Sequence, residues 1–127
     1  MAEHANAALL RKGYAAFSSG DFNALNEFVP EDAVWHVTGN SATISGDYDG
    51  RDAIYAYFGK LMEITGGTFK AELVDVLAND NLGVAIQKST ATVNGKEVVT
   101  TDVLIDRVVN GKAVETWVYM EDDTVLG

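Results

Sequence analysis

The chain has 127 residues, of which 47% are hydrophobic and 22% are charged. This composition is typical of a globular protein, and the length suits one domain over residues 1–127 around one hydrophobic core. A net charge of -10 disfavours binding to nucleic acid or to anionic lipid. Disulfides and thiolate metal sites are excluded because the chain contains no cysteine. No apolar run is long enough for a membrane span and no secretory signal is evident, so we expect a cytoplasmic protein with no membrane partner.

The first half of the chain has the pattern of three helices. Apolar side chains recur every three or four residues over 5–19 and over 22–29, which predicts two helices, the second capped by Asp21. A third helix is predicted to begin near Asp52 and to end before Gly66. Helices are therefore expected only in the N-terminal half.

The rest of the chain has the pattern of strands and turns. A short strand is predicted over 33–38, and the following segment 39–50, rich in Gly, Asn, Ser and Asp, is expected to be a loop. Four longer strands are predicted over 69–77, 82–93, 97–109 and 113–120. The pairs Asn94-Gly95 and Asn110-Gly111 predict type I′ hairpin turns between them. An antiparallel meander preceded by helices is an α+β architecture.

Alternation along the last strand predicts that both faces of the sheet carry apolar side chains. Val118 and its alternate neighbours lie on one face, and Trp117 and Tyr119 lie on the other. Helices can cover only one of these faces, so we expect a homodimer formed through the sheet. The competing interpretation is a monomer with a few exposed aliphatic side chains, which are common on surfaces.

His36 is the leading candidate for a catalytic residue. It follows Trp35 in an apolar strand segment, whereas the other histidine, His4, is close to the N-terminus. An imidazole turned into an apolar pocket can take or give a proton near neutral pH without a metal or a cofactor. The alternative is a half-buried strand histidine that is hydrogen-bonded to a neighbour.

Two aspartates could assist this histidine. Asp102 and Asp106 lie four residues apart on one face of the strand 97–109, and either could orient the His36 ring or act as a second acid or base. Asp102 is the preferred partner. Both residues could instead belong to the surface or to a hairpin.

Several side chains are candidates for binding a ligand. Aromatic groups supply apolar area together with one hydrogen-bonding atom, although ordinary core or surface placement is the alternative for each. The aromatic candidates are Tyr14, Trp35, Tyr57, Trp117 and Tyr119. Gln87, an amide inside an apolar strand, could bond a ligand carbonyl or could face water. The chain has no phosphate-binding loop, dinucleotide fingerprint, nucleophile elbow or histidine pair at metal-ligand spacing, so neither a cofactor nor a metal is expected.

This order of elements resembles the nuclear-transport-factor-2-like superfamily, and within it the SnoaL-like polyketide cyclase and ketosteroid isomerase-like branch. The resemblance extends over nearly the whole chain. It is carried by the segments 15–22, 31–39, 46–54, 65–69, 75–80, 110–112 and 115–119. It implies a cone-shaped fold in which a curved sheet wraps around the helices and leaves a deep, mostly apolar pocket.

The resemblance implies a location for the site more clearly than it implies a reaction. Relatives isomerise steroids, close polyketide rings, open epoxides, dehydrate small substrates or have no known chemistry. His36 falls within one position of the carboxylate base of the isomerase-like members, and a shift of one residue would turn it to the other face. Gly13 and Leu104 stand where the isomerases have their tyrosine and their protonated aspartate, and Tyr119 replaces an aspartate of the epoxide-opening relatives.

Three hypotheses follow for the function. The first is a cofactor-independent enzyme that performs acid/base chemistry of a cyclisation, isomerisation or hydration type on a small apolar substrate. The second is a non-catalytic protein of the same fold that binds a small molecule or has an accessory role. The third is a dimerisation module whose pocket is only a packing defect, an interpretation that a cavity filled by its own side chains would favour.

Overall fold

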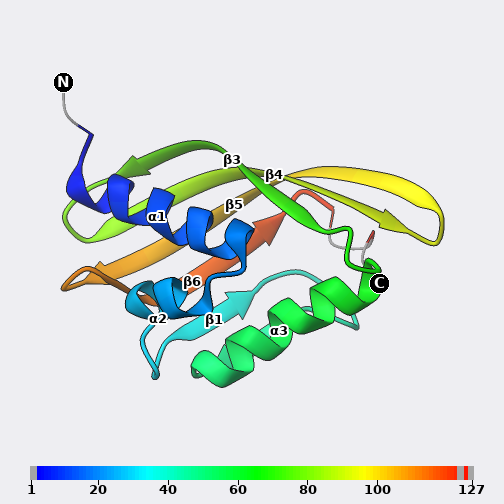
Figure 1. The fold of residues 1–127 in the computed structure, drawn as a ribbon, viewed down its shortest axis with the longest axis horizontal. Coiled ribbons are helices and arrows are strands. Elements are labelled where there is room, and N and C mark those ends of the chain that lie inside the picture. Colours follow the sequence, from blue (N-terminus) through cyan, green and yellow to red (C-terminus); the bar gives the residue numbers. More distant parts are fainter. Residues whose placement is uncertain (1–2, 123–124, 126–127) are drawn as a thin grey trace.

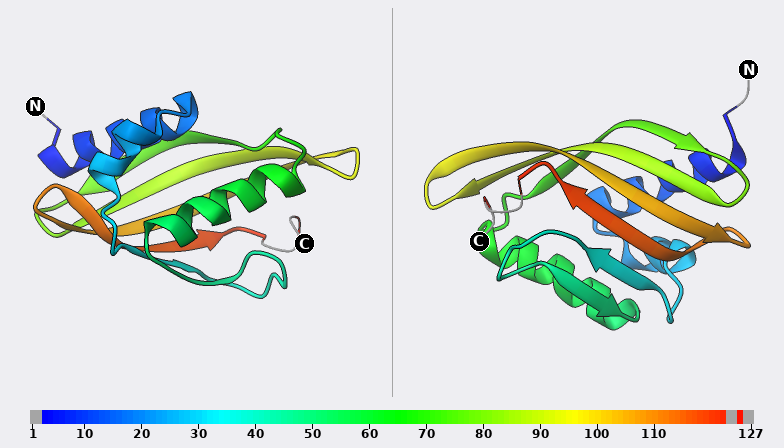
Figure 2. Two further views of the ribbon diagram at one scale, coloured as in Figure 1. Left: turned by 60° about the horizontal axis from the view of Figure 1, so that its bottom comes forward. Right: turned by 180° about the vertical axis from the view of Figure 1, so that it is seen from behind.

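The computed structural model describes residues 3–122 and residue 125. Three helices cover one face of a six-stranded sheet, which confirms the predicted α+β architecture. Figure 1 shows the helices lying across the strands, and Figure 2 shows that the sheet is curved and that no helix of the described residues lies on its other face. In the described part of the chain, no helix is both long enough and apolar enough to cross a membrane.

The observed elements match the predicted helices and long strands to within one or two residues. The helices are α1 (Ala5–Ser19), α2 (Phe22–Phe28) and α3 (Arg51–Ile64). The strands are β1 (Val34–Val37), β2 (Gly46–Asp49), β3 (Lys70–Ala78), β4 (Leu82–Val93), β5 (Lys96–Val109) and β6 (Lys112–Met120). In the sheet these strands lie in the order β2-β1-β6-β5-β4-β3.

Both predicted Asn-Gly turns are present. The φ angles are 52° and 77° at Asn94 and Gly95, and 51° and 77° at Asn110 and Gly111. Positive φ at both central residues is the geometry of a type I′ turn, whose twist matches that of the two strands it joins. These turns set the register of the meander, because each hairpin has a loop of only two residues.

The sheet differs from the prediction in two respects. The segment expected to be a loop contains β2, which pairs antiparallel with β1 and carries Tyr48 as its one half-buried side chain. Four residues with a single inward side chain are too few to show an alternating pattern. In addition, β1 pairs in parallel with β6, so the sheet is mixed and not antiparallel throughout. That pairing joins segments about 80 residues apart and depends on how the whole chain folds.

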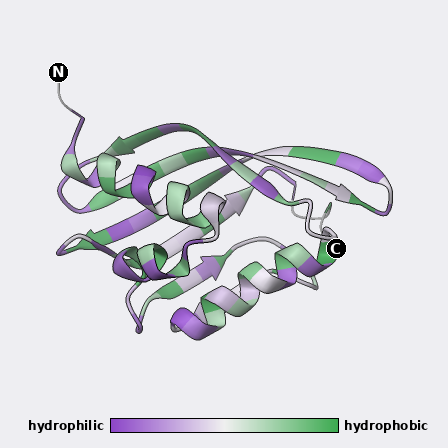
Figure 3. Ribbon diagram, in the orientation of Figure 1, coloured by the Kyte–Doolittle hydropathy of each residue, from purple (hydrophilic) through white to green (hydrophobic). Residues whose placement is uncertain are grey.

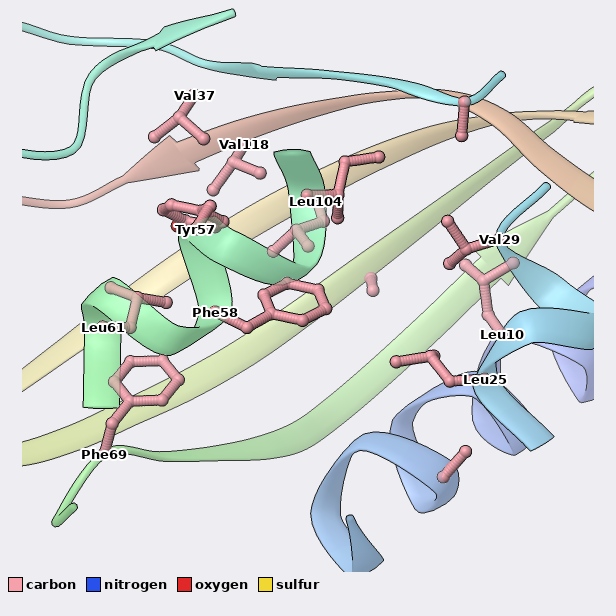
Figure 4. Packing of buried hydrophobic residues seen from close by; sticks show 14 of the residues in the cluster. Leu10, Leu25, Val29, Val37, Tyr57, Phe58, Leu61, Phe69, Leu104 and Val118 are labelled. Atoms are coloured by element: carbon pink, nitrogen blue, oxygen red, sulfur yellow. The ribbon is translucent and has the colours of Figure 1, made fainter. Parts of the chain in front are cut away.

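The hydrophobic core lies between the helices and the inner face of the sheet. Figure 3 shows hydrophobic residues along both the helices and the long strands. In Figure 4, Phe58 of α3 lies next to Leu104 of the sheet, whereas Leu25 of α2 lies near Leu10 and Val29, and all of these side chains are buried. The same inner face of β5 also carries polar side chains that are buried, namely Thr100, Asp102 and Asp106.

Candidate functional site

A cavity lies between the three helices and the inner face of the sheet. It contains about 670 Å³ of empty space when the open solvent at its mouth is included. Its walls are mostly apolar. Six of its aromatic side chains are Phe17, Phe28, Trp35, Tyr57, Phe58 and Phe69. Such walls exclude water from polar groups and provide a large contact area for an apolar ligand.

Close contact between α1 and α2 shapes one wall of this cavity. A Cβ atom added to Gly13 of α1 would lie 2.9 Å from a ring carbon of Phe28 at the end of α2. The absence of a side chain at Gly13 therefore lets Phe28 pack against α1 and line the cavity. A larger side chain at position 13 would collide with the Phe28 ring.

Asp106 is the one carboxyl side chain in the cavity wall among the described residues. It is 5% exposed, and its Oδ1 accepts a hydrogen bond from Thr116 on the neighbouring strand β6. Burial raises the pKa of Asp106 to about 6, although the hydrogen bond from Thr116 acts in the opposite direction. Asp106 can therefore exchange a proton near neutral pH, which is the property required of a general acid or base.

A chain of hydrogen bonds leads from the cavity to a second aspartate behind its wall. The Tyr14 hydroxyl of α1 donates to Gln87 Oε1 on β4 at 2.6 Å. The Gln87 amide group donates to Ser89 and to Asp102, at 2.9 and 3.3 Å. Burial, followed by the charges of Asp106 and Asp102, raises the pKa of the Tyr14 hydroxyl, so it remains protonated. Tyr14 and Gln87 line the cavity, whereas Asp102 does not.

Two further polar groups belong to the cavity wall. Trp35 Nε1 is buried without a hydrogen-bond acceptor among the described residues. A buried donor without a partner costs roughly 1–3 kcal/mol, so this N–H group favours a molecule that can accept a hydrogen bond. Burial, followed by the neighbouring Tyr48 and Asp102, raises the pKa of the Tyr57 hydroxyl, so it remains protonated.

His36 lies outside this cavity, which corrects the expectation from the sequence. Its Nδ1 is 2.7 Å from Asp47 of β2 and its Nε2 is 2.6 Å from Glu115 of β6, and its ring stacks on Trp117 at 5.5 Å between ring centroids. Successive side chains of a strand point to opposite faces. Because Trp35 points into the cavity, its neighbour His36 must point to the outer face of the sheet.

Two other candidates are also on the outer face. Trp117 pairs with Ile105 and His36, and Tyr119 is 45% exposed, so neither lines the cavity. Alternation along the last strand had separated these two aromatic side chains from Val118, and Val118 is the residue that lines the cavity. The expectation that Trp117 and Tyr119 form cavity walls is therefore wrong.

The remaining candidates do lie at the cavity. Tyr14, Trp35, Tyr57, Gln87 and Leu104 contribute to its walls, and their binding of a ligand stays a prediction. The sequence interpretation considered Asp106 only as a partner of His36 and missed its position in the wall. A signal for it was available, because Asp106 is two residues from Leu104 and therefore shares its face of the strand.

The described residues contain no group of three His, Cys, Asp or Glu side chains arranged to hold a metal ion. The polar groups that the described residues bring to the cavity wall are one carboxyl group, one amide, two tyrosine hydroxyls and one indole N–H.

The fold and this cavity define a nuclear-transport-factor-2-like α+β protein with an internal pocket, and the comparisons with known proteins identify the family. Residues 10–116 match the family model of the SnoaL-like domain, and the chain belongs to this family. This match confirms the resemblance that the sequence motifs indicated.

Relatives agree with this assignment. The structure of Bal32a, from a soil-derived mobile gene cassette, is 41% identical with a TM-score of 0.85, over 92% of this chain and 89% of that chain. An uncharacterised protein of Mycobacterium tuberculosis is 29% identical over 113 residues, which are 88% of this chain and 86% of that protein. IdmH from Streptomyces antibioticus, a proposed polyketide cyclase, shares the fold at 23% identity and a TM-score of 0.79, over 97% of this chain and 96% of that chain.

Proposed function

We propose that this protein binds a small, mostly apolar molecule in the cavity and performs cofactor-independent acid–base chemistry on it, with Asp106 as the group that takes and returns the proton. The observation that carries the proposal is a single buried carboxyl group, of pKa about 6, in a wall that is otherwise largely aromatic and aliphatic. Membership of a family that contains proposed polyketide cyclases is consistent with this chemistry.

The proposed step is a proton transfer between substrate and carboxylate. Asp106 accepts a proton from an acidic C–H next to a carbonyl group, and the electron pair of that bond remains on the substrate as an enolate. The Tyr57 hydroxyl, which burial keeps protonated, can donate to the enolate oxygen. Return of the proton to a different atom of the substrate gives an isomerisation. Attack of the enolate carbon on a second carbonyl gives a cyclisation, in which the C=O π bond breaks and the alkoxide that forms takes the proton back from Asp106.

The experiment measures hydrogen–deuterium exchange at the acidic methylene of 2-tetralone in deuterated buffer, followed by NMR. General-base catalysis contributes a factor of roughly 100 to 10,000, so Asp106→Asn is expected to lower the protein-dependent exchange rate at least about 100-fold. The rate should rise with pH through about 6, because only the ionised Asp106 carboxylate can accept the proton.

His36→Gln is the matched control for this experiment. His36 contacts Asp47, Glu115 and Trp117 on the outer face and does not line the cavity, so its substitution should leave the exchange rate unchanged. Full activity of Asp106→Asn, or loss of activity in His36→Gln, would contradict the assignment of the proton transfer to Asp106.

The second candidate function is ligand binding without turnover. The observation that favours it is that Asp106 is the only carboxyl side chain in the cavity wall, with no histidine or lysine beside it among the described residues. If the protein binds 2-tetralone without any acceleration of exchange, binding without catalysis is the better description.

We also propose that the outer face of the sheet forms a homodimer interface. One row across this face contains Leu77, Val84, Ile105, Trp117, His36 and Asp47, one residue from each strand. Its first four members are apolar, and a second copy would present the same row across a two-fold axis.

A further inference from the structure

The hydrogen bonds behind the cavity wall run in one direction, from Tyr14 toward Asp102. The Tyr14 hydroxyl donates to Gln87 Oε1 at 2.6 Å. On the other side of the same amide, Gln87 Nε2 donates to Ser89 Oγ at 2.9 Å and to Asp102 Oδ2 at 3.3 Å. The amide nitrogen of Gln87 therefore faces Asp102, and its carbonyl oxygen faces Tyr14.

Asp102 sets this direction. It is 1% exposed, and besides Gln87 its oxygens accept from Ser89 Oγ, Thr100 Oγ1 and the backbone N–H of Glu121. A carboxylate has only acceptors, so the end of the Gln87 amide next to it must be the NH₂ group. The opposite orientation would bring two acceptors together inside the protein with no proton between them.

The consequence reaches the cavity through Tyr14. A tyrosine hydroxyl has one proton, and the proton of Tyr14 is committed to the Gln87 carbonyl. Toward the cavity, which Tyr14 lines, its oxygen has only lone pairs to offer. Tyr14 is therefore a hydrogen-bond acceptor for a ligand, although an isolated tyrosine can serve equally well as a donor.

We propose that Asp102, acting through Gln87, makes Tyr14 a specificity-determining acceptor, so that the cavity selects molecules that bring a hydroxyl or N–H group to Tyr14 over molecules with a carbonyl or ether there. Asp102 is a positioning residue in this proposal, because it touches Gln87 and not the cavity. The proposal rests on the proposed function in one respect, because it requires that a ligand occupies the cavity.

The test compares two probes with the same ring system, 2-naphthol and 2-methoxynaphthalene. The first can donate a hydrogen bond, and the second can only accept one. Their dissociation constants are measured by titration calorimetry at neutral pH. The unmodified protein should bind 2-naphthol at least about fivefold more tightly, which is the usual value of one hydrogen bond in a protein.

Asp102→Asn should remove or reverse this preference. The backbone N–H of Glu121 can only donate, so it holds the oxygen of the new side chain and turns its NH₂ group toward Gln87. The Gln87 amide then flips, its nitrogen donates to Tyr14, and the Tyr14 proton is free to point into the cavity. The dissociation constant of 2-methoxynaphthalene divided by that of 2-naphthol should therefore fall from about five to about one or below.

Ser89→Ala is the matched control. It removes a hydroxyl from the same buried cluster but leaves the bond between Gln87 and Asp102, so the preference for 2-naphthol should persist. Asp106 can also accept from 2-naphthol, and therefore a ratio that Asp102→Asn leaves unchanged would assign the selectivity to Asp106 and overturn the proposal. If Asp102→Asn does not fold, Tyr14→Phe replaces it, since loss of the Tyr14 oxygen should also bring the ratio to about one.

The outcomes separate this proposal from the catalytic one. If the protein prefers 2-naphthol but does not exchange the protons of 2-tetralone, the proposal for Asp102 stands and the catalytic proposal for Asp106 is wrong. If the protein exchanges these protons but binds both naphthalenes equally, the proposal for Asp106 stands and that for Asp102 is wrong. If neither naphthalene binds, the proposal for Asp102 is wrong, and exchange of the 2-tetralone protons alone decides the proposal for Asp106.

Discussion

At the scale of single residues, His36 shows how a histidine with two carboxylate neighbours differs from a catalytic one. Carboxylates can only accept hydrogen bonds, so both ring nitrogens of His36 must donate to satisfy Asp47 and Glu115, which requires the charged imidazolium. The hydrogen bond to Asp47, followed by that to Glu115, raises the pKa of His36. The role of His36 in this geometry is to connect three strands.

The hydrogen bonds of His36 to Asp47 and Glu115 predict how the stability of the folded protein depends on pH. A group whose pKa is higher in the folded state contributes its full stabilisation of that state below its unfolded pKa, which is about 6.5 for histidine. This contribution is lost as the pH rises through the folded pKa. The hydrogen bond from His36, followed by that from Arg107, lowers the pKa of Glu115, so the contribution of Glu115 is lost as the pH falls through its lowered value. The group formed by His36, Asp47 and Glu115 should therefore stabilise the folded protein most at mildly acidic pH.

The measurement is the midpoint of urea unfolding at pH 6 and at pH 9, for the unmodified protein and for His36→Gln. Raising the pH should lower the midpoint of the unmodified protein more than that of the variant, because only the former loses a proton from this ring. If the midpoints of the two proteins change equally with pH, the protonation of His36 makes no measurable contribution to stability.

At the scale of elements, the cavity depends on how α2 is held against α3. Arg51, the first residue of α3, donates its Nε to the carbonyl of Val29 at 2.8 Å and its Nη2 to the carbonyl of Asn26 at 3.1 Å. These carbonyls are at the C-terminal end of α2, where helical partners are missing and a positive charge is favoured. The contact fixes the helix that supplies Leu25 and Phe28 to the cavity wall.

We expect Arg51→Met to lower the free energy of unfolding by about 2 kcal/mol, since two charge-assisted hydrogen bonds are lost and two carbonyls are left without this partner. Ligand affinity should fall as well, because α2 is less firmly placed. Chemical denaturation and titration calorimetry measure the two effects. Lys12→Met, at an exposed position of α1, is the control and should change neither quantity.

At the scale of the whole molecule, we propose that the outer face of the sheet binds a second copy of the chain. Tyr119 is 45% exposed and Leu77 is 59% exposed, and both lie on this face beside Ile105 and Trp117. Apolar side chains gathered in this way are unusual on a monomer and are typical of an interface. A second copy of the chain can cover the face without a change in fold.

The expected mass in solution at micromolar concentration is that of a dimer of the 13.6 kDa chain. Ile105→Glu, at the centre of the row, should shift the mass to that of a monomer, because a carboxylate cannot be buried between two sheets without a partner. Phe22→Glu places the same charge at an exposed residue on the helical side and should leave the dimer intact. Light scattering measures both, and a monomeric unmodified protein would contradict the proposal.

The sequence alone determined the local structure of this protein. Helical spacing, capping residues and Asn-Gly turns depend on interactions between neighbours in the chain, and the elements they predict match those observed to within one or two residues. The motifs also indicated the SnoaL-like family, which the family match confirms. Of the candidate site, the structure places Tyr14, Trp35, Tyr57, Gln87 and Leu104 in the cavity wall, and their binding of a ligand stays a prediction.

Only the tertiary structure decided which face of each strand meets the helices. Alternation separates Trp35 from His36 and Val118 from Trp117, but it does not say which member of each pair is buried, because that depends on the elements packed on either side. The same limit concealed Asp106 in the cavity wall, the parallel pairing of β1 with β6 and the short strand β2. The proposed catalytic group therefore moved from a histidine on the outer face to an aspartate on the inner face, since burial is a property of the packed molecule and not of the strand.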